Sequence, residues 1–529
     1  MYNAIIIDRT MKKIYLFAFM AMMAMQMQAQ AVLDTYMGAQ LATEDLNGTA
    51  RYVGMGGAME ALGADISTIG TNPAGIGLFR KSQVSGSFGL VLQSEGKSFQ
   101  DGSKTNASFD QLGIVISTRW GAHSYINYGF NYHKNRNFNH VLSAANAAVN
   151  GSSQNRQTCI KGIRGDLDMR YGDSQVDYLY LESGMIEDEY GTMYTIDAKD
   201  YTFDRANTGY IGEYDFNLSG NINNRVYLGL TFGIKDVHYK SYTEYTENLL
   251  SGDPNIFFVG MHDSHKITGQ GFDVKAGVIV RPIEESPFRI GVHVSTPTFY
   301  KLTTSNYSTI HDQYGEVRDV SMDNDFRFNT PWKFGISMGH TVGNYLALGA
   351  SYEYADYSTN DMRAITSSGY DWDGYYHEDS DTDPVVKHHT QETLRGVSTL
   401  KLGAEFKPDP NIALRLGYNY VSPMYKKTGV RDQTLITPAT MLASTTDYTN
   451  WQDTHRITAG VGFTFDQLRL DLAYQFSARS GDFYPYMNGV SAKYIDDATG
   501  QTITLSNECQ AVKVKDNRHQ LLCTLTYTF

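Results

Sequence analysis

Segments in which apolar and polar residues alternate recur along this chain from residue 83 to residue 529. In LRLDLAYQF, residues 468–476, every second residue is leucine, tyrosine or phenylalanine, and the residues between them are arginine, aspartate, alanine and glutamine. Successive side chains of a strand point to opposite faces, so this pattern predicts strands with one apolar face. The same alternation is found in residues 126–132, 226–234, 272–280, 288–294, 332–338, 400–406, 412–420 and 457–465.

The residues at the ends of these apolar faces favour a membrane barrel over a soluble sandwich, which would also alternate. The faces often end in Tyr, Phe or Trp, as in the aromatic girdles of barrels that cross a bilayer. The chain has 38 Tyr, 25 Phe and 49 Gly, only 12 Pro, and a mean hydropathy of -0.37. This composition fits a barrel, because only every second residue of a strand meets lipid.

The sequence therefore predicts an all-β fold, a transmembrane antiparallel β-barrel of about 14 strands. The strands are expected to begin near Gln83, Phe109, Ser124, Tyr210, Val226, Gly269, Phe288, Phe326, Tyr345, Glu392, Ile412, Trp451, Leu468 and His519. Short turns are expected at residues 223–224, 342–344, 408–410 and 466–467, and long polar insertions at 135–208, 357–391, 422–450 and 477–518. Short turns at one end and long loops at the other are typical of outer-membrane barrels.

The N-terminal region predicts export from the cytoplasm. Lys12 and Lys13 precede an apolar stretch at residues 14–25, and Ala29 and Ala31 offer cleavage sites. This is the pattern of a secretory signal peptide, so residues 1–30 are predicted to be upstream residues and a signal that is removed. No later run reaches the ~20 apolar residues of a spanning helix, so any membrane crossing has to be made by strands.

The last segment of the chain, residues 519–529, ends on an aromatic residue in register with its apolar face. Leu521, Cys523, Leu525, Tyr527 and Phe529 share that face. This segment resembles the terminal strand of bacterial outer-membrane proteins, which the barrel assembly machinery recognises. Tyr527 and Phe529 are therefore the expected assembly signal, and the bacterial outer membrane is the expected location.

Residues 50–79, ARYVGMGGAMEALGADISTIGTNPAGIGLF, do not fit a strand, a long helix or a linker. Each interior glycine costs a helix about 1 kcal/mol relative to alanine. The segment is also too apolar to be a solvated linker, so it needs a surrounding wall. We expect residues 31–81 to form a plug, or hatch, inside a barrel built from residues 82–529.

The sequence resembles the FadL/TodX family (OMPP1) of outer-membrane transporters for hydrophobic compounds. The resemblance is firmest in residues 46–88, through Arg51, the glycines Gly54, Gly56 and Gly57, and the NPAG motif of Asn72, Pro73, Ala74 and Gly75. It continues in PWKFGISMG and in HRITAGVGFTFDQLRLDLAYQF. It implies passive uptake of long-chain fatty acids or other hydrophobic small molecules, gated by the hatch, with a kinked strand allowing lateral release. It implies no cofactor.

Two questions about the hatch and the function stay open at this stage. The NPAG motif is either a gate, with the Asn72 amide tying hatch to wall, or only a tight turn. The alternative functions are an accessory barrel that docks secreted proteins, as relatives do in type IX secretion, or a barrel with a mainly structural role.

Other partners and chemistries are constrained by charge and motif. The net charge of -13 argues against a nucleic-acid partner, and outer-membrane lipid and lipopolysaccharide are the expected surroundings. No HExxH motif is present, and the GISMG match to GxSxG at residues 335–339 lies within a predicted strand rather than at a strand-to-helix elbow, so we expect no enzyme. Cys159, Cys509 and Cys523 show no metal or disulfide spacing. His388 and His389 lie near Glu378, Asp381 and Asp383, but a solvated loop is the expected setting rather than a metal site. Asp371, Trp372, Asp373, Tyr375 and Tyr376 form an acidic, aromatic loop tip that is expected to meet either substrate or the cell surface.

Overall fold

The computed structural model describes residues 34–164, 175–183, 195–250, 257–431, 445–495 and 500–529. The predicted signal peptide, residues 1–30, lies outside the described residues. No helix in the described part of the chain is long and apolar enough to cross a membrane.

The strands form one closed antiparallel ring, because β1 pairs with β2 on one side and with the last strand, β21, on the other. The strands of the ring are β1 (Gln83–Gln93), β2 (Thr105–Arg119), β3 (Tyr125–Asn137), β4 (His140–Ala147), β5 (Ala198–Ile222), β6 (Val226–Leu249), β7 (Phe258–Val280), β8 (Arg289–Ser295), β9 (Phe299–Asp312), β10 (Gly315–Asn329), β11 (Lys333–Val342), β12 (Leu346–Asp356), β13 (Asp361–Tyr370), β15 (Gly396–Asp409), β16 (Ile412–Val421), β17 (Tyr448–Phe465), β18 (Leu468–Tyr484) and β21 (Val512–Thr528). Four pairs of consecutive strands each fill the place of a single strand in the wall: β3 with β4, β8 with β9, β10 with β11, and β12 with β13. The barrel is therefore 14 strands around. The predicted fourteen-stranded barrel is confirmed.

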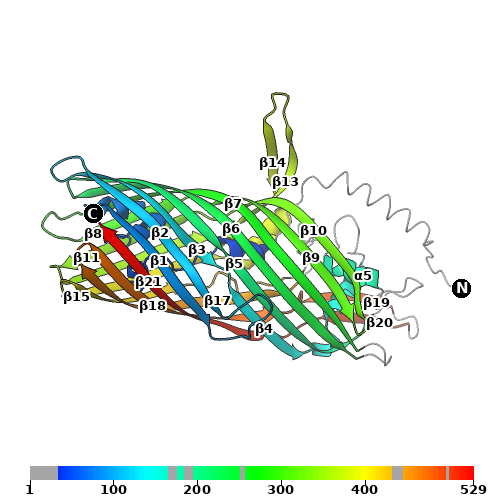
Figure 1. Ribbon diagram of the computed structural model, residues 1–529. Helices are drawn as coiled ribbons and strands as arrows, with labels where there is room; N and C mark the ends of the chain where they lie inside the picture. Colours follow the sequence, from blue (N-terminus) through cyan, green and yellow to red (C-terminus); the bar gives the residue numbers. More distant parts are fainter. Residues whose placement is uncertain (1–33, 165–174, 184–194, 251–256, 432–444, 496–499) are drawn as a thin grey trace.

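The two ends of the barrel differ (Figure 1). At the turn end, β5 and β6 are joined through Asn223 and Asn224, and β17 and β18 through Asp466, all with positive φ. Such residues fit the tight turns that match the twist of paired strands. At the opposite end, the loop end, several connections are long, and those at residues 148–197 and 383–395 carry helices. The predicted asymmetry of turns and loops is confirmed.

The outer surface of the barrel carries an apolar belt. On β6, Leu228, Leu230 and Phe232 are exposed, but the outward positions beyond them are Asp236 and His238. β21 exposes Leu521, Leu525, Tyr527 and Phe529. The inward positions of the same strands are polar and buried. Apolar outside and polar inside is the arrangement of a barrel that crosses a bilayer.

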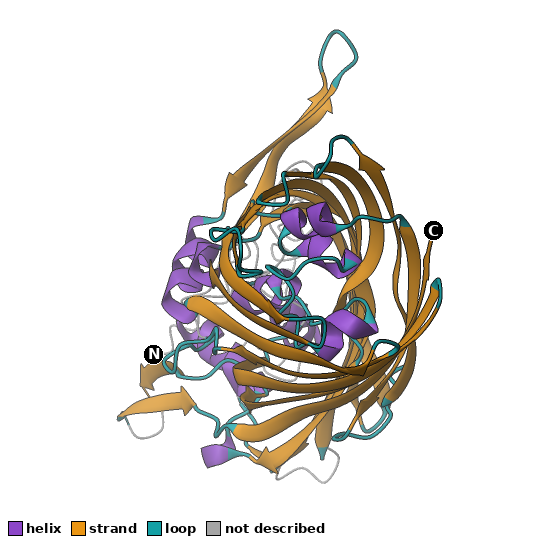
Figure 2. Ribbon diagram, turned by 90° about the vertical axis from the view of Figure 1, so that its left-hand side faces the viewer, coloured by secondary structure: helices purple, strands orange, loops and turns teal. Residues whose placement is uncertain are grey.

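The chain from Asp34 to Lys81 runs inside the ring (Figure 2). It contains the short helices α2 (Thr35–Ala42) and α3 (Ala50–Gly54) and the 3-10 helices η1 (Ile66–Gly70) and η2 (Pro73–Leu78). Most of these residues are buried. A lumen of this width cannot be filled by the side chains of its own wall, which explains why an inner segment is needed.

Several predicted loop regions are folded, contrary to expectation. The 477–518 region lengthens β18 to Tyr484 and starts β21 at Val512, and it contains β19 (Val490–Ile495) and β20 (Thr502–Asn507) between them. The 135–208 region contains β4, η3 (Val149–Gly151), α4 (Gln154–Arg164), α5 (Gln175–Ser183) and the first part of β5. The 357–391 region contains η4 (Tyr357–Thr359), β13, β14 (Tyr376–Thr382) and most of α6 (Pro384–Thr393). β13 and β14 form a hairpin that stands away from the barrel wall, with Trp372 at its exposed tip (Figure 1).

A buried carboxyl group holds α4 in place at the loop end, well beyond the apolar belt. Glu247 accepts hydrogen bonds from the backbone N–H of Gln154, from the Asn155 side chain and from the Tyr245 hydroxyl. Burial raises the pKa of Glu247 to about 7, and these hydrogen bonds oppose that shift.

The expectation of a solvated loop holds for the exposure of His388 but is wrong for His389. Both residues lie on α6, where His388 is exposed and His389 is buried. The His389 ring contacts the Thr35 hydroxyl at 2.8 Å and the Val430 carbonyl at 2.8 Å. The two histidines therefore diverge, and His389 packs the plug helix α2 against α6.

Candidate channel: plug and lumen

Each short helix of the plug begins at a side-chain cap. Asp34, Thr49, Asp65 and Asn72 accept hydrogen bonds from the backbone N–H groups of Met37, Tyr52, Ser67 and Ala74, respectively. Such caps satisfy N–H groups that the first turn of a helix leaves free. The plug can therefore fold as a series of short turns, as its glycine content requires.

A belt of wall glycines receives the plug. A β-carbon added to any of these glycines would contact or overlap plug atoms, and in several cases the plug backbone. The belt consists of Gly113, Gly129, Gly229, Gly277, Gly291, Gly339, Gly349, Gly403, Gly417 and Gly460, one from each of ten strands. Gly339, Gly349, Gly403 and Gly417 are direct neighbours across successive strand pairs. The plug thus lies directly on the wall backbone.

Ion pairs reinforce this contact. The Arg51 guanidinium donates two hydrogen bonds to Glu405 on β15, at 3.0 and 3.1 Å, and a third to the Ala64 carbonyl. Glu405 also accepts from Arg415, which in turn pairs with Asp471 at 2.7 Å. The paired fork of arginine and carboxylate is a strong, directional contact. Arg51, noted from the sequence within the glycine motif, therefore ties the plug to the wall.

Replacing Arg51 with alanine is expected to loosen the plug without unfolding the barrel. Glu405 keeps Arg415 as a partner, so the loss is roughly 1–3 kcal/mol from the charged hydrogen bonds of Arg51. Calorimetry should show a separate transition of the plug at lower temperature, with the transition of the barrel unchanged. Arg51→Lys keeps the charge and serves as the control. A single unchanged transition for Arg51→Ala would contradict this role.

The NPAG motif lies in the plug, as the sequence predicts. The Asn72 side chain was expected to bond to the wall, but it forms no hydrogen bond to a described wall residue. Its Oδ1 accepts from the backbone N–H of Ala74, at 3.1 Å, and its buried Nδ2 has no hydrogen-bond partner among the described residues. The wall beside it consists of Gly277 and Gly291, which bring no side chains. The motif contacts the wall instead through the Pro73 carbonyl, which accepts from the Ser219 hydroxyl at 2.8 Å.

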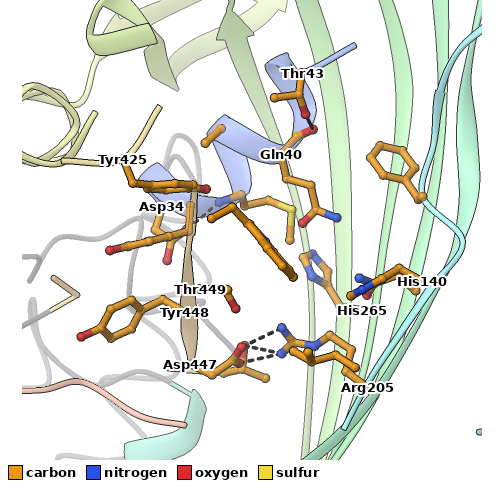
Figure 3. A pocket seen from close by; sticks show the side chains of 18 of the residues that line it. Asp34, Gln40, Thr43, His140, Arg205, His265, Tyr425, Asp447, Tyr448 and Thr449 are labelled. Atoms are coloured by element: carbon orange, nitrogen blue, oxygen red, sulfur yellow. Dashed lines mark hydrogen bonds and ion pairs between the residues drawn. The ribbon is translucent and has the colours of Figure 1, made fainter. Parts of the chain in front are cut away.

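Between α2 and the wall, on the loop side of the plug, lies a cavity of about 160 Å³, the outer chamber (Figure 3). Five arginines line it, against two aspartates: Arg136, Arg205, Arg431, Arg479, Arg518, Asp34 and Asp447. Arg205 pairs with Asp447, at 2.6 Å, and Arg431 with Asp34, at 2.8 Å. Met37, Phe138, Leu142 and Met424 add apolar surface. Arg136 pairs with Asp45, and Arg479 and Arg518 both pair with Asp516, so the five arginines face four aspartates. The chamber is therefore amphipathic and nearly balanced in charge.

A second cavity of about 160 Å³, the inner chamber, lies between the wall and the plug residues that follow α2, from Thr43 to Thr71. It shares the lining residues Thr43, Arg136, Met424, Trp451 and Arg479 with the outer chamber. Arg479 stands over the Trp451 ring at 4.2 Å from its centroid. The two chambers therefore adjoin at Trp451.

Arg456 differs from the other lumen arginines. It lines the inner chamber and a smaller cavity beside the plug, and its Nη1 donates to Asn419 Oδ1 at 2.8 Å. No carboxylate in the described residues forms an ion pair with it. A buried guanidinium that forms no ion pair with a described carboxylate is suited to binding an anionic group of a ligand.

The wall is split beside that smaller cavity. β2 and β3 pair only from Gln111 with His133 to Arg119 with Tyr125. Beyond Gln111, β2 keeps its pairing with β1, whereas β3 and β4 keep theirs with β5. The register of β3 shifts between Lys134 and Arg136, so the strand bends there. Plug residue Asn47 bridges the split, donating to Asp110 Oδ1 at 2.9 Å and to the Lys134 carbonyl at 3.1 Å.

One group of three described residues brings potential metal ligands close together: Glu60, His293 and Glu353. The two carboxylates face opposite nitrogens of the same ring, at 3.7 and 3.6 Å. Lys401 Nζ also lies 2.7 Å from Glu60 Oε1. A metal ion with ligand distances of about 2.0–2.2 Å would need a different arrangement. The geometry suits ion pairing.

Comparison with known proteins gives similarities to solved structures alone. No family model and no curated protein matches the chain. Among solved structures, it is similar to a Pseudomonas aeruginosa FadL homologue, with 14% identity, a TM-score of 0.48, and coverage of 92% of this chain and 100% of that one. It is also similar to the toluene transporters TbuX of Ralstonia pickettii and TodX of Pseudomonas putida. Each has 12% identity and coverage of 92% of this chain and 99% of the other, with TM-scores of 0.46 and 0.45.

Proposed function

We propose that this protein is an outer-membrane channel for the passive uptake of amphiphilic hydrophobic molecules, with long-chain fatty acids as the leading candidates. The observation that carries the proposal is the combination of an apolar-belted, plugged barrel with two adjoining lumen chambers that lead to a split in the wall. A plugged lumen is unsuited to bulk diffusion of water-soluble solutes. A lateral opening suits a solute that prefers lipid.

The lining of the chambers favours a ligand with an anionic head over a pure hydrocarbon. A buried cation without a charged partner costs free energy, which an anionic group would offset. Arg456 forms no ion pair with a described carboxylate, and the five arginines of the outer chamber share four aspartates. The nearby methionines and aromatic residues would contact the apolar tail.

The hatch is proposed to control this route. The hatch glycines Gly54, Gly56 and Gly57 and the NPAG residues Asn72, Pro73, Ala74 and Gly75 lie in the segments that rest on the glycine belt. A shift of the plug that withdraws Asn47 from Asp110 and Lys134 would open the split between β2 and β3. The ligand would then leave sideways toward the membrane.

The proposed location, the outer membrane with lipopolysaccharide around the loop end, follows from the apolar belt and the polar wall beyond it. The barrel assembly machinery is the proposed partner in biogenesis. Tyr527 and Phe529 are the proposed signal, since both are exposed on the belt and their rings stack at 6.2 Å between centroids.

Tryptophan fluorescence provides a direct test. Trp451 lies between the two chambers, whereas Trp120, Trp332 and Trp372 are 74%, 49% and 96% exposed. A brominated long-chain fatty acid should quench the Trp451 signal in a saturable way, and unbrominated acid should compete. In Trp451→Phe the saturable component should disappear. Equal quenching curves for the two proteins would contradict binding in the lumen.

One observation favours the alternative of an accessory docking barrel. The β13–β14 hairpin presents Tyr370, Trp372 and Tyr375 at 77%, 96% and 70% exposure. Exposed aromatic residues on a projecting arm are typical of protein contacts. Deleting the hairpin tip distinguishes the two functions, because fatty-acid binding should persist whereas co-purification of secreted proteins should be lost.

A further inference from the structure

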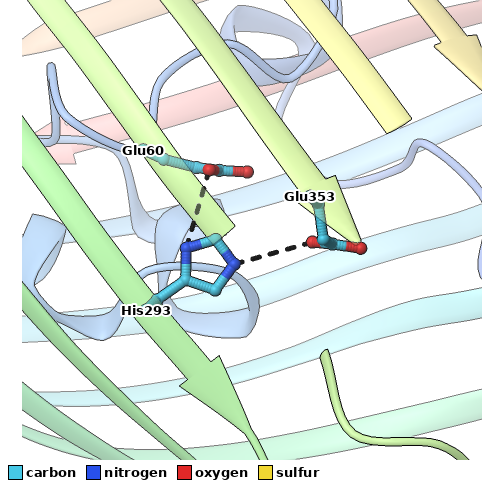
Figure 4. Close-up of side chains that lie close together, drawn as sticks. All are labelled: Glu60, His293 and Glu353. Atoms are coloured by element: carbon cyan, nitrogen blue, oxygen red, sulfur yellow. Dashed lines mark ion pairs between the residues drawn. The ribbon is translucent and has the colours of Figure 1, made fainter. Parts of the chain in front are cut away.

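His293 lies between a plug residue and a wall residue (Figure 4). Its Nδ1 is 3.7 Å from Glu60 of the plug, and its Nε2 is 3.6 Å from Glu353 on β12. The ring lies against Gly335 of β11, where a side chain would overlap it. Three segments that are far apart in the sequence thus meet at one imidazole.

These groups are buried and incompletely satisfied. The side chains of His293 and Glu60 are 1% and 0% exposed. Neither nitrogen of His293 has a hydrogen-bond partner, and neither does Glu60 Oε2, within the part of the chain that the structure describes. Unsatisfied buried polar groups are rare and require an explanation. The inner chamber, which His293, Glu353 and Lys401 help to line, gives water and protons access to the cluster.

The surrounding charges are nearly balanced. Lys401 on β15 lies 2.7 Å from Glu60 and 3.7 Å from Glu353. On β11, Lys333 pairs with Glu44, at 2.6 Å, and on β7, Lys275 pairs with Asp273, at 3.0 Å. With a neutral imidazole, Glu60, Glu353 and Lys401 sum to a charge of -1. One added proton on His293 brings the cluster to zero and gives each carboxylate an N–H donor.

We propose that His293 is a proton-dependent clasp between hatch and wall. The protonated ring holds Glu60 and Glu353 together and keeps the plug seated. Loss of the proton removes one donor and the positive charge, leaves Lys401 to face both carboxylates with Lys333 acting only on Glu353, and loosens the plug around Glu60. Histidine is the side chain whose charge changes most readily near neutral pH. The clasp is independent of which molecule the channel carries.

Hydrogen exchange of the plug, measured by mass spectrometry on the full-length protein in lipid nanodiscs, tests this clasp. Peptides covering residues 55–62 are followed from about pH 5 to about pH 9 in wild type and His293→Gln, compared at each pH so that the intrinsic rates cancel. In wild type, protection of these peptides relative to the variant should fall about tenfold as the pH rises, the size expected for a charged hydrogen bond. In His293→Gln, protection should be low throughout.

A second histidine that faces two carboxylates, the half-buried His133, supplies a matched control. These carboxylates are Glu213 at 3.6 Å and Asp215 at 3.4 Å, but both are on β5. His133→Gln should therefore keep the wild-type fall in protection of residues 55–62 with rising pH, called the pH step below. Heat-modifiable mobility in SDS gels shows whether His293→Gln folds. If it does not fold, Glu353→Gln is used instead, and the pH step should be smaller in this variant than in wild type.

Two results would overturn the proposal. The first is a pH step of equal size in wild type and in the His293→Gln or Glu353→Gln variant, or no step in wild type. The second is protection that depends on added Zn²⁺ at constant pH and is abolished by a chelator, which would make the cluster a metal site.

Discussion

Valine in place of Gly403 and Gly417 is expected to unseat the plug and turn a closed barrel into an ion-conducting one. These glycines face each other across the β15–β16 pair. A β-carbon on Gly403 would overlap the Met55 carbonyl, and one on Gly417 would overlap the backbone of Met55 and Gly56. Backbone atoms cannot rotate away as a flexible side chain can. Overpacking costs typically 1–3 kcal/mol per site, and here both sites act on the same turn.

The barrel itself should survive this change, because its strands are held by main-chain hydrogen bonds and its outer face is untouched. Conductance in planar bilayers should rise at least about tenfold over wild type, while heat-modifiable mobility stays the same. Gly369→Val is the control, since a β-carbon on this hairpin glycine meets nothing within 4 Å. Wild-type conductance in the folded double variant would show that the plug does not depend on the glycine belt.

Arg456→Gln is expected to weaken the binding of long-chain fatty acids by about tenfold or more. A hydrogen bond to a charged group is worth about 1.5–3 kcal/mol, and Arg456 is a lumen cation without a carboxylate partner in the described residues. The substitution strands no buried carboxylate, so the barrel should fold normally. Replacing Arg205 or Arg431 would instead leave Asp447 or Asp34 without its partner.

The head-group contact can be separated from tail contacts by the choice of ligand. Binding of the corresponding long-chain alcohol, measured by competition in the Trp451 quenching assay, should be the same in wild type and Arg456→Gln. Arg456→Lys should retain most of the affinity for the acid. Equal loss of acid and alcohol binding would mean that Arg456 shapes the chamber rather than binding the anionic group.

The sequence predicted the strands well where they carry the apolar belt and less well beyond it. β6, β16 and β18 begin at Val226, Ile412 and Leu468 as expected. β21 begins at Val512 rather than His519, and β7 at Phe258 rather than Gly269. The outward positions of these extensions are polar, because they lie beyond the belt. Apolar alternation therefore stops at the edge of the belt, although the backbone continues as strand.

No pattern in the sequence predicted which side chains interact in the lumen. Glu60, His293 and Glu353 lie far apart in sequence, and Arg456 occupies an ordinary inward position of a strand. The wall glycines also look unremarkable, since glycine is common on the polar faces of all the strands. Their shared role depends on closure of the ring, which brings ten separate strands around one plug.

The sequence by itself determined the class of this protein, because alternation, tight turns, an apolar glycine-rich segment and a terminal aromatic each act over a few residues. It therefore specified a plugged barrel with an apolar outer face. Only the tertiary structure decided which inward side chains meet. Closing the barrel fixes the stagger between strands, and that stagger sets which residues stand at the same height around the lumen. The chambers, the split between β2 and β3 and the His293 cluster all depend on it.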